Sequence, residues 1–104
     1  MYLVQTTDTF DRWLKKLKDK KARAKILVRI KRIQTGNMGT INSIGLNLLE
    51  LKITYGPGYR IYFTRQKKSI IILLCGGDKS SQSTDIKKAN SILKELEDNN
   101  DIKN

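Results

Sequence analysis

The sequence contains no histidine and a single cysteine, Cys75. The lack of histidine excludes serine–histidine and cysteine–histidine nucleophilic mechanisms, together with metal sites that use imidazole ligands. One cysteine supports neither a disulfide framework nor a cysteine-based zinc site. Because Cys75 lies within an apolar run, we expect it to be a small buried hydrophobe and not a nucleophile.

Long hydrophobic runs are also missing. No window approaches the roughly 18 consecutive apolar residues that a transmembrane helix needs. The first ten residues are polar and lack the pattern of a signal peptide. We therefore expect a cytoplasmic protein without membrane partners. A length of 104 residues with 38% hydrophobic content suits one domain with one core, which we place at residues 1–97, before a polar tail at 98–104.

Acidic residues are few: 10 Asp and Glu stand against 21 Lys and Arg, which gives a formal net charge of +11. A lysine-rich composition that follows an AT-rich genome would explain this total. The positive charge is nevertheless concentrated in one region, because eleven of the basic residues lie between Arg12 and Arg32 with Asp19 as the one acid among them. This regional field favours an anionic partner such as nucleic acid.

Periodicity in the first half predicts a short strand over residues 1–5 and then two amphipathic helices. Thr7 or Asp8 caps the first helix, and Asp19 caps the second. The apolar residues recur at helical spacing, at positions 10, 13, 14 and 17 and at positions 22, 26, 30 and 33. So short a connection predicts an antiparallel helical hairpin, which ends near Gly36.

The second half changes to period-two alternation. Residues 49–54 and 59–64 read as strands joined by the Gly56-Pro57-Gly58 turn, and residues 70–75 read as a buried strand. Residues 42–45 read as a loop, and Thr84 is expected to cap a last helix. The order β-α-α-β-β-β-α predicts a two-layer α+β fold, in which the helical hairpin packs on a twisted antiparallel sheet.

The opposite face of that sheet is expected to carry Lys52, Arg60 and Tyr62, partly exposed to solvent. RNA can be cleaved by its own 2′-hydroxyl if the protein orients the strand, stabilises the phosphate and helps to move protons. Arginine suits the phosphate because its planar fork binds two oxygens, and lysine, tyrosine or a carboxylate can move protons. Lys79, after the last strand, is a further candidate of the right type.

Each candidate also has a purely structural interpretation. Arg60 is expected to pair with Glu50 across the hairpin if it has no function. Tyr62 would then pack over the sheet, and Asp78 and Lys79 would be turn residues. The acids Glu50, Asp78 and Asp85 are too dispersed in the sequence to predict a carboxylate pair.

Six segments together resemble the RelE/ParE superfamily of bacterial toxins, and more closely its phage-derived, HigB-like addiction-module killer proteins. They are residues 9–17, residues 22–26 with 29–33, Gly36-Asn37, Leu49-Glu-Leu-Lys52, the motif GPGYRIYF at residues 56–63 and the motif LLCGGDKS at residues 73–80. The resemblance covers residues 9–96. It implies the toxin of a type II toxin–antitoxin pair, held inactive by a cognate antitoxin, usually a helix-turn-helix protein. Many relatives cleave mRNA, generally on the ribosome, and the fold implied is two helices against a twisted antiparallel sheet.

By position in these motifs, Arg60 matches the arginine that relatives use for the scissile phosphate. Lys52 stands where the subfamily has arginine, and Lys79 where relatives present a basic residue. Some relatives use a histidine or a tyrosine near the C-terminus, and this sequence has neither after Tyr62. Tyr62 and Asp85 are therefore the candidates for proton transfer. We expect no metal and no other cofactor. RNA or ribosome affinity is expected from the cations of the second helix, namely Arg23, Lys25, Arg29, Lys31 and Arg32.

Two other functions stay open from the sequence. The ParE branch shares the fold but is thought to poison DNA gyrase without cutting RNA. A basic nucleic-acid-binding protein without enzymatic activity is the third interpretation, although a recognisable binding motif is missing.

Overall fold

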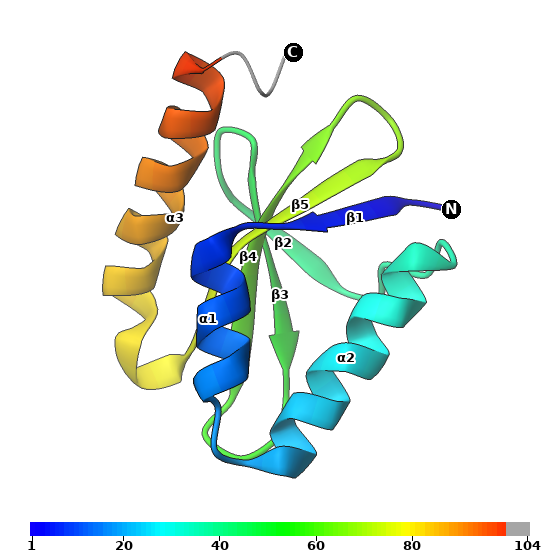
Figure 1. Ribbon diagram of the computed structural model, residues 1–104, viewed down its shortest axis with the longest axis vertical. Helices are drawn as coiled ribbons and strands as arrows, with labels where there is room; N and C mark the ends of the chain where they lie inside the picture. The colour runs from blue at the N-terminus through cyan, green and yellow to red at the C-terminus, as the bar shows by residue number, and fades with distance from the viewer. Residues whose placement is uncertain (100–104) are drawn as a thin grey trace.

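A computed structural model describes residues 1–99 and shows a mixed α+β fold (Figure 1), as predicted. The elements are β1 (Leu3–Thr6), α1 (Asp8–Lys16), α2 (Lys20–Gln34), β2 (Ile41–Gly45), β3 (Leu48–Ile53), β4 (Tyr59–Gln66), β5 (Ile70–Asp78), the 3₁₀ turn η1 (Lys79–Ser81) and α3 (Gln82–Asp98). The strands form one sheet in the order β1-β5-β4-β3-β2. The predicted antiparallel pairing of β3, β4 and β5 is confirmed. The predicted polar tail lies mostly outside the described residues.

Two parts of the sheet differ from the expectation. The segment expected as a loop forms β2, which pairs antiparallel with β3 and places Ile41 opposite Leu51. Its alternation is too short and too polar to stand out in the sequence. The first strand, β1, pairs in parallel with β5, so the sheet is mixed and not purely antiparallel. The Thr7 hydroxyl donates a hydrogen bond to the Leu74 carbonyl at 2.6 Å and ties the end of β1 to β5.

The helices α1 and α2 begin where the capping residues predict. The Thr7 side chain accepts a hydrogen bond from the Phe10 amide, and the Asp19 carboxylate accepts from two amides of the first turn of α2. The two helices diverge from the short turn between them as an open V, so the expected hairpin is not closely packed on itself (Figure 1). Arg23 Nη2 donates to the Leu17 carbonyl at 2.6 Å and closes this turn.

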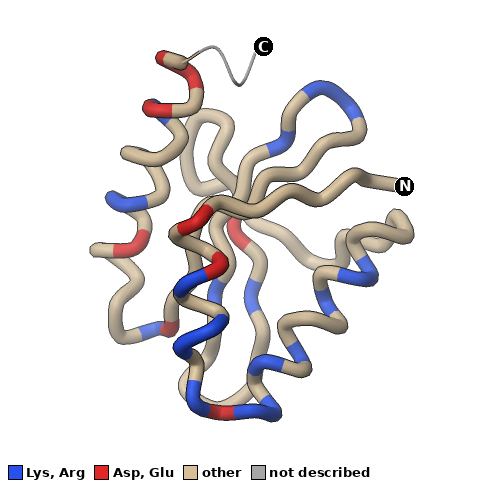
Figure 2. Tube along the Cα trace, viewed as in Figure 1, with Lys and Arg blue, Asp and Glu red and all other residues tan. Residues whose placement is uncertain are grey.

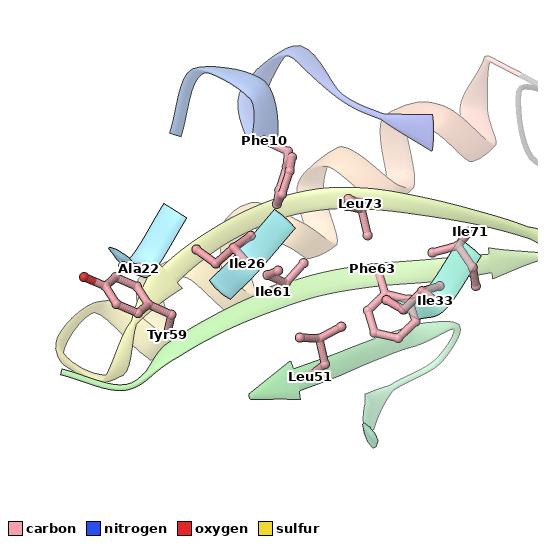
Figure 3. Packing of buried hydrophobic residues seen from close by; sticks show 10 residues of the cluster. All are labelled: Phe10, Ala22, Ile26, Ile33, Leu51, Tyr59, Ile61, Phe63, Ile71 and Leu73. Atoms are coloured by element: carbon pink, nitrogen blue, oxygen red, sulfur yellow. The ribbon is translucent and has the colours of Figure 1, made fainter. Parts of the chain in front are cut away.

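Both helices pack on the same face of the sheet, which confirms the predicted helical layer. Phe10 of α1 and Ile26 and Ile33 of α2 meet the inward residues of the central strands (Figure 3). Those strand residues are Leu51, Tyr59, Ile61, Phe63, Ile71 and Leu73. Full burial of one such aliphatic or aromatic side chain is worth about 1.5–3 kcal/mol, so this cluster dominates the stability of the fold.

The opposite face of the sheet is covered by α3, which corrects the expectation of a partly exposed surface. Ala89 and Leu93 of α3 pack in the same buried cluster as Tyr62 and Leu74. Tyr62 is completely buried, and Arg60 is only 9% exposed. The apolar stripe of α3 requires an apolar surface, and α1 and α2 already occupy the other face. The helix begins at Gln82 after η1, three residues earlier than a Thr84 cap would give.

None of the helices within residues 1–99 combines the length and the hydrophobicity that a membrane span requires.

Candidate functional site

The register of β3 and β4 brings the predicted site residues together on the face that α3 covers. Lys52 lies directly opposite Arg60, and Glu50 lies opposite Tyr62. On the other side of β4, Arg60 lies opposite Gly77 of β5. We call the buried polar group on this face the Arg60 cluster, which consists of Glu50, Arg60, Tyr62, Gln82 and Asp85.

The guanidinium of Arg60 lies beside two acceptors of the protein, although its buried Nε makes no hydrogen bond with a described residue. Its Nε lies 3.7 Å from Glu50 Oε2, and its Nη1 donates to the Gly58 carbonyl at 3.4 Å. Gln82 Nε2 of α3 donates to the same Glu50 oxygen at 3.1 Å, and Glu50 is only 2% exposed. The structural interpretation of Arg60 as the ion-pair partner of Glu50 is therefore confirmed. Arg60 Nη2 makes no hydrogen bond with any described residue. Because this atom is not fully buried, it is available to a ligand.

Tyr62 and Asp85 lie deeper in the cluster than the sequence suggested. The Tyr62 hydroxyl is buried and has no hydrogen-bond partner among residues 1–99. Burial raises the pKa of Tyr62 above its ordinary value, and the carboxylates of Glu50 and Asp85 raise it further, while Arg60 opposes them. Asp85 is 6% exposed and accepts a hydrogen bond from the Ser81 hydroxyl at 2.5 Å. Neither residue is open to an RNA strand in this structure.

Glu50 and Asp85 are far apart in the sequence, and folding brings both close enough to Tyr62 to act on its hydroxyl. Glu50 of β3 and Asp85 of α3 both act on the pKa of Tyr62, although 35 positions separate them in the chain. Asp78 lies at the end of β5, where the Ser80 side chain donates to it and lowers the pKa of Asp78, and the nearby Arg60 lowers it further. The capping position of Asp78 at η1 is a signal that sequence analysis can use.

The glycines Gly76 and Gly77 lie inside β5, which extends to Asp78, beyond the strand predicted over residues 70–75. A Cβ atom on Gly76 would lie 2.5 Å from the ring of Trp13, which packs on it from α1. A Cβ atom on Gly77 would overlap the carboxylate of Asp85, which approaches from α3. The two glycines thus let large or charged side chains approach the strand from both faces.

Cys75 confirms the expectation of an inert, buried thiol. It is 1% exposed, and burial raises the pKa of Cys75 from 9.0 to about 12, with a further contribution from Asp85. The thiolate is therefore unpopulated near neutral pH, which makes Cys75 unsuited to nucleophilic chemistry.

The two lysines of the predicted site are both exposed, and only Lys52 is tied to Arg60 by the register of the sheet. Lys79 lies in η1, and its side chain makes no hydrogen bond or ion pair with any described residue. Within residues 1–99 there is no group of three cysteine, aspartate or glutamate side chains that could hold a metal ion. Lys52 and Lys79 are exposed cations of a type suited to phosphate.

The helix cations divide into two groups. Figure 2 shows basic positions along the whole of α2. Arg23 closes the turn before α2, and Arg29 Nη2 donates to the carbonyls of Met38 and Thr40 at 3.2 and 3.3 Å, so both have structural roles. The other three predicted RNA contacts, Lys25, Lys31 and Arg32, are exposed. Their contact with RNA stays a prediction.

A groove between α2 and the end of β3 was not predicted from the sequence. This α2–β3 groove has a volume of about 410 Å³, and four cations line it. They are Lys25, Arg29, Arg32 and Lys52. The Lys25 ammonium lies 5.2 Å from the centre of the Tyr55 ring, which also lines the groove. Lys52 thus belongs to the groove and, as the strand neighbour of Arg60, borders the Arg60 cluster.

Residues 12–97 match the family described as Phage derived protein Gp49-like (DUF891). The chain belongs to this Gp49-like family. A relative from Haemophilus influenzae (strain ATCC 51907 / DSM 11121 / KW20 / Rd), described only as an uncharacterized protein, is 53% identical over 93 residues, which are 89% of this chain and 94% of the relative. The Gp49-like family is RelE-like and toxin-like, which confirms the broader part of the resemblance. The HigB-like subfamily remains a prediction.

Proposed function

We propose that this Gp49-like protein is the toxin of a type II toxin–antitoxin pair and inhibits translation by cleaving mRNA on the ribosome. The observation that carries the proposal is the pairing of Arg60 with Lys52 across β3 and β4. Glu50 orients the guanidinium, and Nη2 of Arg60 is left without a protein partner among the described residues. A guanidinium beside an exposed ammonium is suited to an RNA phosphate.

In the proposed reaction the 2′-oxygen of the RNA attacks the adjacent phosphorus, and the bond from phosphorus to the 5′-oxygen breaks. Arg60 and Lys52 stabilise the negative charge that develops on the non-bridging oxygens, and Lys79 supports them. Tyr62 and Asp85 are buried behind Arg60, so we assign them to positioning roles. The protons of the two oxygens are then exchanged with water, and no metal takes part.

The test is induced expression of the protein, followed by primer extension on cellular mRNA. We expect new 5′ ends in the wild type and, because Arg60 supplies the charge stabilisation, about a hundredfold less cleavage in Arg60→Ala. Arg65→Ala is the matched control, since Arg65 is an exposed arginine of the same strand. If a folded Arg60→Ala variant cleaves mRNA as well as the wild type does, the site assignment is wrong. A small helix-turn-helix protein encoded next to this chain would support the toxin–antitoxin module.

One observation favours a second candidate, a ParE-like toxin that inhibits DNA gyrase without cutting RNA. Tyr62 and Asp85, the predicted proton-transfer groups, are enclosed by the protein, and acid–base catalysis requires contact with the reacting atoms. Growth arrest with intact mRNA and a DNA-damage response would support this candidate and contradict mRNA cleavage.

A further inference from the structure

We infer that the α2–β3 groove is a docking site for an acidic, amphipathic polypeptide segment of a partner protein. The groove is separate from the buried Arg60 cluster, although Lys52 borders both. Three features carry the inference: an apolar floor, a cationic rim and an aromatic ring that is already covered.

The floor of the groove is apolar and open. Val28 of α2 is 52% exposed, and Ala24 and Ile53 line the groove beside it. The strand β2 begins with Ile41 opposite Leu51, so the residues of β3 after Leu51 have no partner strand on that side. A half-exposed valine in an open groove can bury further apolar area when a nonpolar side chain of a partner binds there.

The rim of the groove is cationic, and none of the described residues that line it is acidic. Lys25, Arg32 and Lys52 are exposed, whereas Arg29 is fixed by its hydrogen bonds to two carbonyls. Asp19 does not line the groove, but its carboxylate accepts a hydrogen bond at 3.4 Å from the hydroxyl of Tyr55, which does. Carboxylates that flank an apolar anchor complement this arrangement of charge.

An RNA strand fits the groove less well. Sequence-tolerant binding of single strands relies on aromatic faces on which bases stack. Among the described residues that line the groove, Tyr55 is the aromatic one, and the Lys25 ammonium lies 5.2 Å from its ring centre. The apolar floor at Val28 and Ile53 offers nothing to a phosphate. The combination of aliphatic floor and cationic rim therefore favours an acidic peptide.

Docking in the groove would also cover Lys52. This consequence rests on the proposed function, in which Lys52 contacts the scissile phosphate beside Arg60. An occupant of the groove would then compete with the RNA substrate, without entering the Arg60 cluster itself.

The test uses the full-length protein and a fluorescent synthetic peptide of about 14 residues, with Leu at helical i, i+3 and i+7 spacing and Glu at the other positions. Binding is measured by fluorescence anisotropy. Two controls are a scrambled peptide of the same composition and a single-stranded RNA of similar length. The groove variants are Val28→Ser, which removes the apolar anchor, and Arg32→Glu, which reverses one rim charge. Lys87→Glu on α3 is the matched control, because it makes the same charge reversal at an exposed residue outside the groove.

We expect the amphipathic peptide to bind the wild type and to lose about tenfold in affinity with Arg32→Glu and several-fold with Val28→Ser. Lys87→Glu should retain the affinity of the wild type. Equal binding of the scrambled peptide, an unchanged affinity with Val28→Ser, or no binding of either peptide would overturn the inference. Displacement of the peptide by RNA, with RNA affinity lowered by Val28→Ser, would identify a nucleic-acid site instead. The peptide measurement does not depend on mRNA cleavage, so the two proposals can fail separately.

Discussion

The Arg60 cluster and the α2–β3 groove differ in burial, although Lys52 and Arg60 lie directly opposite each other on neighbouring strands. In the cluster, Arg60 is 9% exposed and its charge is balanced by Glu50. In the groove, Lys52 is exposed and joins three other cations without an acidic residue among the described lining. Two cations that face each other across neighbouring strands thus differ in exposure, since Arg60 is largely buried and Lys52 is open to solvent. Removal of a charge from the cluster should affect folding strongly, and removal of a charge from the groove should affect binding instead.

The largest effect is expected from Glu50→Ala. This change leaves the Arg60 guanidinium buried without its carboxylate, which should lower the free energy of unfolding by about 4 kcal/mol. Urea denaturation measures the loss. Lys52→Ala, on the same strand, is the matched control and should change stability by less than about 0.5 kcal/mol. Equal losses in the two variants would show that the cluster and the groove do not differ as described.

Gly77→Ala should have the next largest effect. The added methyl group would overlap the Asp85 carboxylate and force α3 away from β5, at a cost of about 2 kcal/mol. Thermal unfolding detects this loss. Gly45→Ala is the control, since a Cβ atom there meets nothing nearer than 3.7 Å. A Gly77→Ala variant as stable as the Gly45→Ala variant would contradict the close approach of Asp85.

A further loss of stability is expected only at alkaline pH and is absent near neutral pH. Burial raises the pKa of Cys75 from 9.0 to about 12, so the folded state keeps the proton that the unfolded state releases. The contribution of the Cys75 thiol to the free energy of unfolding is fully present below pH 9.0 and is lost as the pH rises toward about 12. The slope is about 1.4 kcal/mol per pH unit within this window.

Urea denaturation of the wild type and of Cys75→Ala across that window isolates the contribution of the thiol. The buried phenol of Tyr62, with its raised pKa, adds a loss of the same sign in both proteins. The wild type should therefore lose more stability than Cys75→Ala between the two pH limits. Parallel curves for the two proteins would contradict the burial of Cys75.

The smallest effect is expected in the groove itself. Lys25→Ala removes the exposed ammonium over the half-buried Tyr55 ring, a contact worth about 0.5 kcal/mol at such a site. Chemical denaturation should barely detect the change, and Lys25→Arg, which keeps the cation over the ring, should remove even that difference. A loss comparable with that of Glu50→Ala would mean that the groove cations are part of the folded core.

The sequence predicts most of the helices and central strands for identifiable reasons. Thr7 and Asp19 cap α1 and α2 because their side chains satisfy free amides of the first turn. The alternation around Gly56-Pro57-Gly58 predicts β3 and β4, and the Gly58 amide donates to the Tyr55 carbonyl at 3.0 Å in the turn. These signals are local, so they can be read without knowledge of the rest of the fold.

The parts that escaped prediction depend on contacts between distant segments. Alternation places Arg60 and Tyr62 on one face but does not show what covers that face, and α3 lies more than 20 positions further along the chain. A helix with an apolar stripe needs an apolar surface, and this signal could have revealed that Tyr62 is buried. The α2–β3 groove depends on the position of α2 relative to the end of β3, which local patterns do not encode.

The parallel pairing of β1 with β5 has a consequence for the synthesis of this protein. Residues 3–6 pair with residues 70–73, and Thr7 bonds to Leu74, so the partner of the first strand is translated more than 60 residues after it. Translation adds about 5–20 residues per second, and the N-terminal segment must therefore wait for seconds without its partner. A nascent chain that ends before β5 cannot complete the sheet or position α1 on it. The complete sheet can therefore form only after β5 has been translated.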